Sequence, residues 1–302
     1  MSICVIGAAI LDINAKSKNP IIPQDSNIGT ITLSCGGVGR NIAENLARLK
    51  TDVKLIAPLG DDLFGQKLLN DCQRAGIDMS CCQICPGGLS PAYVAVLDQN
   101  GEMNVAVVGD AVSITFDHIL KHAETIRNSQ VILIDTNLHK DVINSLPDIF
   151  SGKDFYLDTI SVNKAARVKD IAGKIHTLKM NRLEASFLAG FNIEDEDSLE
   201  RAARHFLNQG TKRLVISLGQ EGFYYRTQEE KIRCRPAPII PVNATGAGDA
   251  LMAGITYCSL HNKSGSCTVS FAQAMAKMAL MSESAVNVDI SPEKIEEVQK
   301  IG

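Results

Sequence analysis

Short apolar segments alternate along this chain with longer segments that are apolar on one face only. The short segments are bounded by Gly, Asp or Pro and predict buried strands at residues 3–10, 53–58, 131–135, 155–158 and 213–218. The longer segments predict helices, because apolar residues recur at helical spacing along one stripe, as in residues 198–209. Buried strands joined by such helices form a mostly parallel sheet covered on both faces, which predicts a three-layer α/β/α fold.

Two segments interrupt this alternation. Residues 12–35 and 92–110 are rich in Thr, Ser, Val and Asn, and apolar and polar residues alternate within them. Asp98 and Gly101 mark a hairpin turn in the second segment. We therefore expect a small antiparallel sheet that projects from an α/β core, which comprises residues 1–11, 36–91 and 111–302.

Composition and charge narrow the class of protein. The 302 residues are 45% apolar and 21% charged, which is typical of a globular protein of one or two domains. The 30 basic and 34 acidic side chains give a net charge of −4, whereas nucleic-acid-binding proteins usually carry a basic excess. The apolar run at residues 3–11 is too short to span a bilayer. We expect a cytoplasmic protein with neither a membrane nor a nucleic-acid partner.

The nine cysteines are odd in number and scattered along the sequence. Cys81, Cys82 and Cys85 lie close together, but no further Cys or His stands at a metal-ligand spacing from them. We interpret the cysteines as reduced thiols, which are usual in the cytosol.

The segment Asn243-Ala-Thr-Gly-Ala-Gly-Asp249 runs directly into an apolar helix and is the strongest indication of chemistry. A Gly/Ala turn at a helix start offers free backbone N–H groups at the positive end of the helix dipole, a site for phosphate. Asp249 would repel that anion unless it removes a proton from an attacking hydroxyl while the N–H groups hold the transferred phosphoryl group. The alternative is a tight turn in which Asp249 is an ordinary first-turn acid.

Two weaker motifs also open predicted helices. In Gly36-Gly-Val-Gly-Arg-Asn41 the glycines permit close approach of a ligand, and Asn41 can bond a pair of hydroxyls. The same segment is equally compatible with a plain helix start. Asn181 and Glu184 share one helix face and suit either a hydrated Mg²⁺ ion or a capping box.

A further motif, Ser-Leu-Gly-Gln-Glu-Gly at residues 217–222, ends a predicted strand and either borders a nucleotide or simply turns the chain. Two familiar nucleotide-binding fingerprints are missing. The sequence contains no Gly-x4-Gly-Lys-Ser/Thr loop, and no Gly-x-Gly-x-x-Gly follows the first predicted strand. We therefore expect neither a P-loop protein nor a dinucleotide-binding fold of the usual kind.

In this order and spacing the four motifs resemble those of the ribokinase-like (PfkB) carbohydrate kinases over essentially the whole chain. Residues 36–41 resemble the first family signature, and residues 245–249 resemble the second. Asn181 with Glu184 resembles the family element linked to Mg²⁺ and phosphate, and residues 217–222 resemble the loop on the ATP side. The resemblance implies a ribokinase-like fold, ATP and Mg²⁺ as cofactors, and a projecting sheet that acts as a lid over a small-molecule sugar or nucleoside.

The resemblance also implies roles for individual residues. The catalytic group comprises the acid–base residue Asp249 and an anion hole of Gly246, Ala247 and Gly248. The substrate group comprises Asp12, Gly36, Gly37 and Asn41 and, by approximate alignment on the lid and base side, Ser90, Tyr93, Asn137 and Lys164. The ATP group comprises Asn181, Ser217, Gly219, Gly222 and Thr245. Glu184 is implied to act on Mg²⁺, directly or through water.

One position departs from the family pattern. Many members begin the second signature with Asp, in a region that binds an activating monovalent cation, whereas this chain has Asn243. An amide oxygen is a ligand without charge, so the sequence gives little support for potassium dependence.

Within the family, residues 36–47, residues 176–185 and the Asn before the anion hole resemble members that phosphorylate the 5′-hydroxyl of pseudouridine. Alternatives are a related kinase for ribose, adenosine or a ketose, and a non-catalytic relative that senses a nucleotide or sugar. Loss of Asp249 or of a motif glycine would mark such a non-catalytic relative, and neither is lost. Exposed edges of the predicted lid strands would also permit a homodimer.

Overall fold

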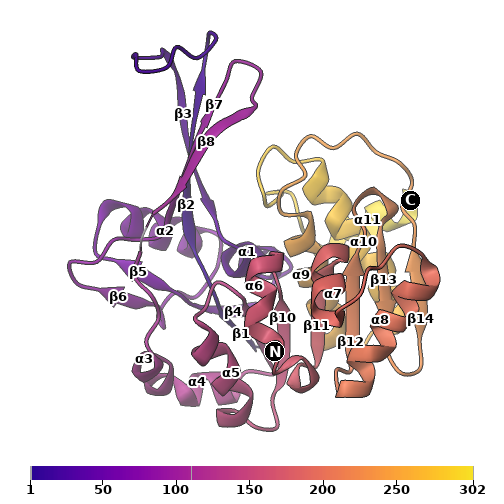
Figure 1. Cartoon of the computed structure of the whole chain (residues 1–302). Coiled ribbons are helices and arrows are strands. Elements are labelled where there is room, and N and C mark those ends of the chain that lie inside the picture. Colours follow the sequence, from indigo (N-terminus) through magenta and orange to yellow (C-terminus); the bar gives the residue numbers. More distant parts are fainter. Residues whose placement is uncertain (1, 110, 302) are drawn as a thin grey trace.

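The computed structural model describes residues 2–109 and 111–301, and its largest element is an eight-stranded sheet (Figure 1). In spatial order the strands are β14 (Lys231–Cys234), β13 (Phe223–Arg226), β12 (Arg213–Ser217), β11 (Thr177–Asn181), β10 (Asp154–Asp158), β9 (Val131–Asp135), β1 (Ser2–Ile6) and β4 (Asp52–Ile56). Neighbouring strands are parallel, except that β13 is antiparallel to both of its neighbours. The mostly parallel sheet that the sequence predicts is confirmed.

Helices cover both faces of this sheet, because successive side chains of each buried strand point to opposite sides. In β1, Ile3 and Val5 belong to one hydrophobic cluster, while Cys4 and Ile6 belong to another. The cluster with Cys4 includes side chains of α3 (Phe116–Lys121), α4 (Ala123–Asn128), α5 (Lys140–Ile149), α6 (Val162–Ala165), α7 (Arg182–Ala189) and α8 (Glu196–Gln209). The cluster with Ile3 includes side chains of α1 (Val38–Arg48), α2 (Leu63–Arg74), α9 (Ala247–Leu260), α10 (Gly265–Leu280) and α11 (Pro292–Ile301). The three-layer α/β/α fold is therefore confirmed.

The first predicted strand, residues 3–10, is wrong in its length. β1 ends at Ile6, and the next strand, β2 (Ile10–Ser17), belongs to a second sheet. The backbone turns between them at Gly7, where an added Cβ would lie 2.5 Å from a carboxylate oxygen of Asp135. The N–H of Ala8 donates to the same oxygen at 2.9 Å. At this position the backbone therefore bonds to a carboxylate instead of to a neighbouring strand.

The second sheet has four strands and projects from the core (Figure 1). We call it the projecting sheet; its strands in spatial order are β3 (Gly29–Gly36), β2, β7 (Ala92–Leu97) and β8 (Met103–Val108). The pairs β2–β3 and β7–β8 are antiparallel, as predicted, but the central pair β2–β7 is parallel. The prediction of a purely antiparallel sheet is therefore wrong, because the two hairpins lie side by side and their inner strands run in the same direction.

The two faces of the projecting sheet differ in character, although the face that carries Asp12, called the polar face below, also carries the exposed Val108 opposite Tyr93. The strand register places Asp12 beside Ser34 and Tyr93 on the polar face. The apolar face carries side chains that are 37–70% exposed: Ile31, Leu33, Val94, Val105 and Val107. A contiguous exposed apolar face of this kind usually marks a surface that another molecule covers.

Short elements complete the chain. β5 (Pro58–Gly60) pairs with β6 (Gln83–Cys85), so the strand predicted at residues 53–58 divides at Ala57. Single 3₁₀ turns are η1 (Ala166–Val168), η2 (Ala172–Lys174) and η3 (Gly219–Glu221). Within residues 2–109 and 111–301, no helix is both long enough and apolar enough to cross a membrane.

Candidate active site

The candidate site lies at the carboxyl ends of the parallel strands of the large sheet. Ligands usually bind at this end of an open α/β sheet. Asp135 ends β9, Asp158 ends β10, and Lys179 lies near the end of β11. Three helices begin here: the first turns of α1 and α7 bond to Asp135 and Thr159, and the first turn of α9 lies against Lys179. Residues that are far apart in sequence are thereby brought together.

The predicted anion hole, Gly246 to Gly248, forms the start of α9. Gly246 has a φ of 85°, and an added Cβ would lie 1.9 Å from the carbonyl oxygen of Ala285, so only glycine fits there. Thr245, which precedes it, is exposed. Among the described residues, no side chain caps the first turn of α9, and residues 246–248 are only half-buried. These backbone N–H groups are therefore available to an anion.

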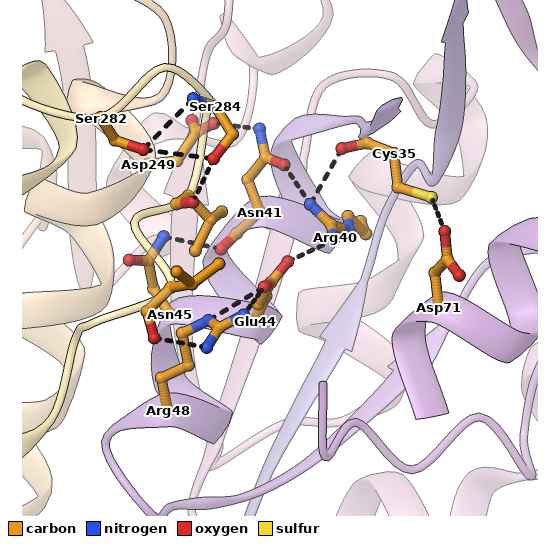
Figure 2. Close-up of polar contacts among 12 residues, drawn as sticks. Cys35, Arg40, Asn41, Glu44, Asn45, Arg48, Asp71, Asp249, Ser282 and Ser284 are labelled. Carbon is orange, nitrogen blue, oxygen red and sulfur yellow. Dashed lines mark hydrogen bonds and ion pairs between the residues drawn. The ribbon is translucent and has the colours of Figure 1, made fainter. Parts of the chain in front are cut away.

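Asp249 lies in the first turn of α9 with a buried side chain. Its Oδ2 accepts a hydrogen bond of 2.8 Å from Nδ2 of Asn41, in the first turn of α1 (Figure 2). Burial and the charge of Asp158 raise the pKa of Asp249 to about 7, against the opposing effects of Lys179 and the Asn41 hydrogen bond. A carboxylate with this pKa is suited to accept a proton near neutral pH.

Lys179 supplies a positive charge that the sequence analysis did not assign. Its buried ammonium forms a 2.5 Å ion pair with Asp158. Burial alone would lower the pKa of Lys179, but the nearby carboxylates, first Asp158 and then Asp249, raise it above its usual value. An added Cβ on Gly248 would lie 2.8 Å from the Lys179 Nζ, so the ammonium lies against the anion hole. The available signal was a lysine between the two apolar residues of a predicted strand, Leu178 and Met180.

Asp135 is a second residue that sequence reasoning missed, and it connects β1 to α1. Its fully buried carboxylate accepts hydrogen bonds from the N–H groups of Ala8 (2.9 Å), Gly39 (2.8 Å) and Asn137 (2.8 Å). Burial raises the pKa of Asp135, although these N–H groups favour the charged form. The available signal was an acid at the end of a strand that is apolar throughout.

The structure brings together Asp12, Gly36, Gly37 and Asn41, which the sequence analysis assigns to the substrate. An added Cβ on Gly36 would lie 2.1 Å from the Asp12 carboxylate, and one on Gly37 would lie 2.5 Å from the Ala8 carbonyl oxygen. Gly37 also has a φ of 96°. Burial raises the pKa of Asp12, and Arg40 opposes this shift. Asn41 follows one helical turn later and contacts Asp249 as described above.

The residues that were placed by approximate alignment differ in their surroundings. Tyr93 is half-buried beside Asp12 on the polar face of the projecting sheet. Ser90 is buried, and its hydroxyl donates to Asp62 at 2.6 Å while accepting from the Gly60 N–H at 2.9 Å. The Ser90 hydroxyl is thus engaged with the segment from the end of β5 to the start of α2, which makes it a poor candidate for a substrate contact.

Asn137 and Lys164 lie in direct contact, with Nζ of Lys164 donating to Oδ1 of Asn137 at 2.5 Å. Asn137 lies two residues after the end of β9, and its N–H donates to the Asp135 carboxylate. Burial lowers the pKa of Lys164, against the opposing charge of Asp135. Both side chains are half-buried beside the strand ends. This pair therefore borders the same cluster as the catalytic candidates.

Asn181 and Glu184 form a capping box at the start of α7, one of the two arrangements that the sequence left open. Oδ1 of Asn181 accepts from the Glu184 N–H at 2.9 Å. The buried Glu184 carboxylate accepts from the N–H and the side-chain amide of Asn181 (2.8 and 2.6 Å) and from the Thr159 hydroxyl (2.6 Å). Three hydrogen bonds leave this carboxylate little capacity for a direct metal bond.

The predicted ATP loop follows β12. The hydroxyl of Ser217 donates to the Met180 carbonyl at 3.4 Å. Gly219 is exposed with open space around it, while an added Cβ on Gly222 would lie 2.2 Å from the Cys234 carbonyl oxygen. The close packing against Cys234 therefore requires glycine at position 222. At Gly219 the space beside the loop is open to a ligand.

Asn243 and the three clustered cysteines complete the residues singled out from the sequence. The Asn243 side chain donates to the Glu283 carbonyl at 3.1 Å and accepts from the Thr245 N–H at 2.9 Å, so both ends of its amide are engaged. Cys81 and Cys82 are buried and Cys85 is half-buried. In the part of the chain that the structure describes, no group of three or more His, Cys, Asp or Glu side chains could hold a metal ion.

Comparison with known proteins gives consistent matches over the full length. The family model described as pfkB family carbohydrate kinase matches residues 1–292. The chain is 36% identical to pseudouridine kinase from Escherichia coli (strain K12) over 292 residues, covering 96% of this chain and 93% of that protein. A solved structure from Clostridium perfringens, described as a sugar kinase, has 31% identity and a TM-score of 0.91, covering 99% of this chain and 95% of that one.

A ribokinase from Arabidopsis thaliana in complex with ribose and ATP has a TM-score of 0.86 at 20% identity, and the match covers 99% of both chains. This likeness establishes the ribokinase-like fold. The family match spans both glycine-rich helix starts and the strand ends between them, so it includes every part of the candidate site. The chain therefore belongs to the pfkB family of carbohydrate kinases, whose ribokinase-like members are ATP-dependent phosphotransferases.

Proposed function

We propose that this protein transfers the γ-phosphoryl group of ATP to the 5′-hydroxyl of pseudouridine, which yields pseudouridine 5′-phosphate and ADP. The observation that carries the reaction type is Asp249, a buried carboxylate whose pKa is raised to about 7 at the uncapped start of α9. An acid in an anion-binding turn is useful when it removes a proton as phosphate charge arrives. The 36% identity to a pseudouridine kinase supports the choice of acceptor.

In the proposed reaction Asp249 takes the proton of the 5′-hydroxyl. A bond forms between the 5′-oxygen and the γ-phosphorus as the bond from that phosphorus to the bridging oxygen of ADP breaks. The N–H groups of residues 246–248 face the charge that gathers on the transferred group. Lys179 adds a positive charge at Gly248, and Asn41 holds the Asp249 carboxylate through Oδ2, which leaves Oδ1 for the proton.

We place Mg²⁺ on the phosphates of ATP, where its charge would neutralise the leaving diphosphate. Glu184 is the carboxylate at the ATP side, and its existing hydrogen bonds fit a contact through water better than a direct bond. Asn243 carries no charge and both ends of its amide are engaged, so we assign no step to a monovalent cation.

Recognition of the acceptor divides between two sides in this proposal. Asp12, on the polar face of the projecting sheet, bonds the ribosyl hydroxyls, and the projecting sheet acts as a lid. We assign the Asn137–Lys164 pair to the base, because it is half-buried beside the strand ends and retains unused donors. Pseudouridine carries one ring N–H more than uridine, so a site built for it leaves a polar group unpaired when uridine binds.

Replacing the proton acceptor tests the reaction type. We expect Asp249→Asn to keep its affinity for ATP, measured by calorimetry, while turnover falls by about 10²–10⁴-fold in an ADP-release assay. Asp195, which caps the exposed start of α8 outside the site, provides a matched control. Asp195→Asn should retain wild-type turnover. Near-normal turnover in Asp249→Asn would contradict the assignment of this residue as the base.

Substrate choice is tested by comparing pseudouridine, uridine, cytidine, adenosine and ribose as acceptors in the same assay. We expect kcat/KM for pseudouridine to exceed that for uridine by at least about 10²-fold, because uridine leaves a buried polar group unpaired. Ribose should be poorer than pseudouridine, since it makes no base contacts. If adenosine or ribose is the best acceptor, the kinase activity stands and pseudouridine is wrong. If none is phosphorylated, the non-catalytic alternative is favoured.

We also propose that a second copy of this chain covers the apolar face of the projecting sheet. The exposed side chains of this face are contributed by three of its strands, β3, β7 and β8, and carry no charge. A self-complementary apolar face suits a two-fold homodimer. The polar face with Asp12 would remain directed at the acceptor.

The dimer is tested by light scattering of the eluting protein in size-exclusion chromatography. Leu33→Glu places a charge on the apolar face and should convert a dimer into a monomer. Thr32→Glu, one residue earlier on the opposite face of β3, is the matched control and should remain dimeric. A wild-type protein that is monomeric at micromolar concentration would rule out the proposed interface.

A further inference from the structure

Arg40 is a buried arginine next to the candidate base; it stands in the motif at residues 36–41, but neither the sequence analysis nor the proposed reaction gives it a role. It lies in the first turn of α1 and is 7% exposed. One of its terminal nitrogens, Nη1, donates to the Cys35 carbonyl at 2.9 Å and to Oδ1 of Asn41 at 3.1 Å (Figure 2). The other terminal nitrogen pairs with Glu44, one turn along the helix. The guanidinium is therefore held on three sides.

The contact with Oδ1 determines which way the Asn41 amide faces. An amide has an oxygen that only accepts and a nitrogen that only donates. With Oδ1 bonded to Arg40, Nδ2 is directed to Oδ2 of Asp249 at 2.8 Å. The opposite orientation would bring the amide oxygen against a carboxylate oxygen and the amide nitrogen against a guanidinium. Both contacts would then be repulsive, so Arg40 and the Asp249 carboxylate together permit only one orientation.

In the described part of the chain, the Asn41 side-chain amide has two hydrogen-bond partners, Asp249 at its nitrogen and Arg40 at its oxygen. The side chain of Asn45 donates to the Asn41 carbonyl at 2.8 Å, but that bond holds the helix backbone and leaves the Asn41 side chain free to rotate. Arg48, two turns after Arg40, pairs with Glu44 and donates to the Val288 carbonyl at 2.8 Å, without touching Asn41. Arg40 is therefore the contact that holds the amide oxygen away from Asp249.

We infer that Arg40 is a positioning residue for Asp249, which acts by locking the Asn41 amide so that its nitrogen always donates to the base. This inference rests on the proposed role of Asp249 and extends it. Arg40 itself is assigned no contact with ATP or the acceptor. The same Nη1 also donates to the carbonyl of Cys35, near the end of β3. One nitrogen of Arg40 therefore contacts both the last residues of a strand of the projecting sheet and the amide that bonds Asp249.

The charged groups around the two residues predict the direction of the effect. Asp249 is faced by Asp135 of β9, Asp158 of β10 and Lys179 of β11, and Asn41 is the hydrogen-bond donor that α1 contributes. Without a locked donor, the charged form of Asp249 loses a stabilising hydrogen bond and its pKa rises. Loss of Arg40 would thus move the acid limb of the activity profile to higher pH.

The groups that face Arg40 are Asp12 of β2, Glu44 of α1, and the Cys35 and Cys72 side chains of β3 and α2. Replacing Arg40 alone would remove one of the charges that pair with the buried Glu44 carboxylate. A double variant that removes both charges is therefore needed beside the single one.

The test is the pH dependence of kcat/KM between pH 5 and 9 for wild type, Arg40→Met and Arg40→Met/Glu44→Met. We expect both variants to shift the acid limb upward by about one unit, so that activity falls about tenfold at pH 6 and recovers to within about twofold at pH 9. Arg48→Met, which removes an equal charge from the same helix and the same partner, should leave the limb in place. Thermal melting establishes which variants fold.

An acid limb that stays in place in a folded Arg40 variant would overturn the inference, and so would an equal shift in Arg48→Met. A second readout does not depend on turnover: the carboxyl carbon of Asp249, identified in ¹³C NMR by its loss in Asp249→Asn, should titrate at higher pH in Arg40→Met. If wild type phosphorylates no acceptor but this titration moves, the proposed function fails while the positioning role stands. If wild type phosphorylates an acceptor but neither the acid limb nor the NMR titration moves in the Arg40 variant, the positioning role fails while the proposed function stands.

Discussion

The positive charge of Lys179 lies among the buried carboxylates of Asp158, Asp249 and Glu184, and the site depends on it. Buried carboxylates are costly unless an opposite charge and hydrogen bonds stabilise them. Lys179 extends from β11 toward the start of α9, and Gly248 has no side chain to block the ammonium. The central strands of the sheet and the start of α9 therefore meet around one ammonium group.

The same arrangement gives the site its chemistry. Burial and Asp158 raise the pKa of Asp249, while Lys179 and Asn41 limit the rise, so the carboxylate is balanced between its two protonation states near neutral pH. The uncapped N–H groups beside it provide partial positive charge for phosphate. Asp135 connects the turn after β1 to the start of α1 by accepting hydrogen bonds from both. It thereby holds in place the helix that carries Asn41.

Local patterns were sufficient to predict the layers of the fold and the glycine-rich helix starts, because periodicity and turn chemistry depend on neighbouring residues. They could not show which side chains meet across the sheet. Asp135 contacts Gly39, 96 positions away, and Asn41 contacts Asp249, 208 positions away. The parallel pairing of β2 with β7 was missed for the same reason, because it joins two hairpins that are distant in sequence.

The pH dependence of kcat/KM of the wild-type enzyme for the proposed acceptor, pseudouridine, tests the role of Asp249 most directly. If Asp249 must be deprotonated to accept the hydroxyl proton, kcat/KM should rise with pH and level off above an apparent pKa of about 7. Below that value it should fall about tenfold for each pH unit. A profile that stays flat from pH 8 down to pH 5 would contradict the assignment of Asp249 as the buried base.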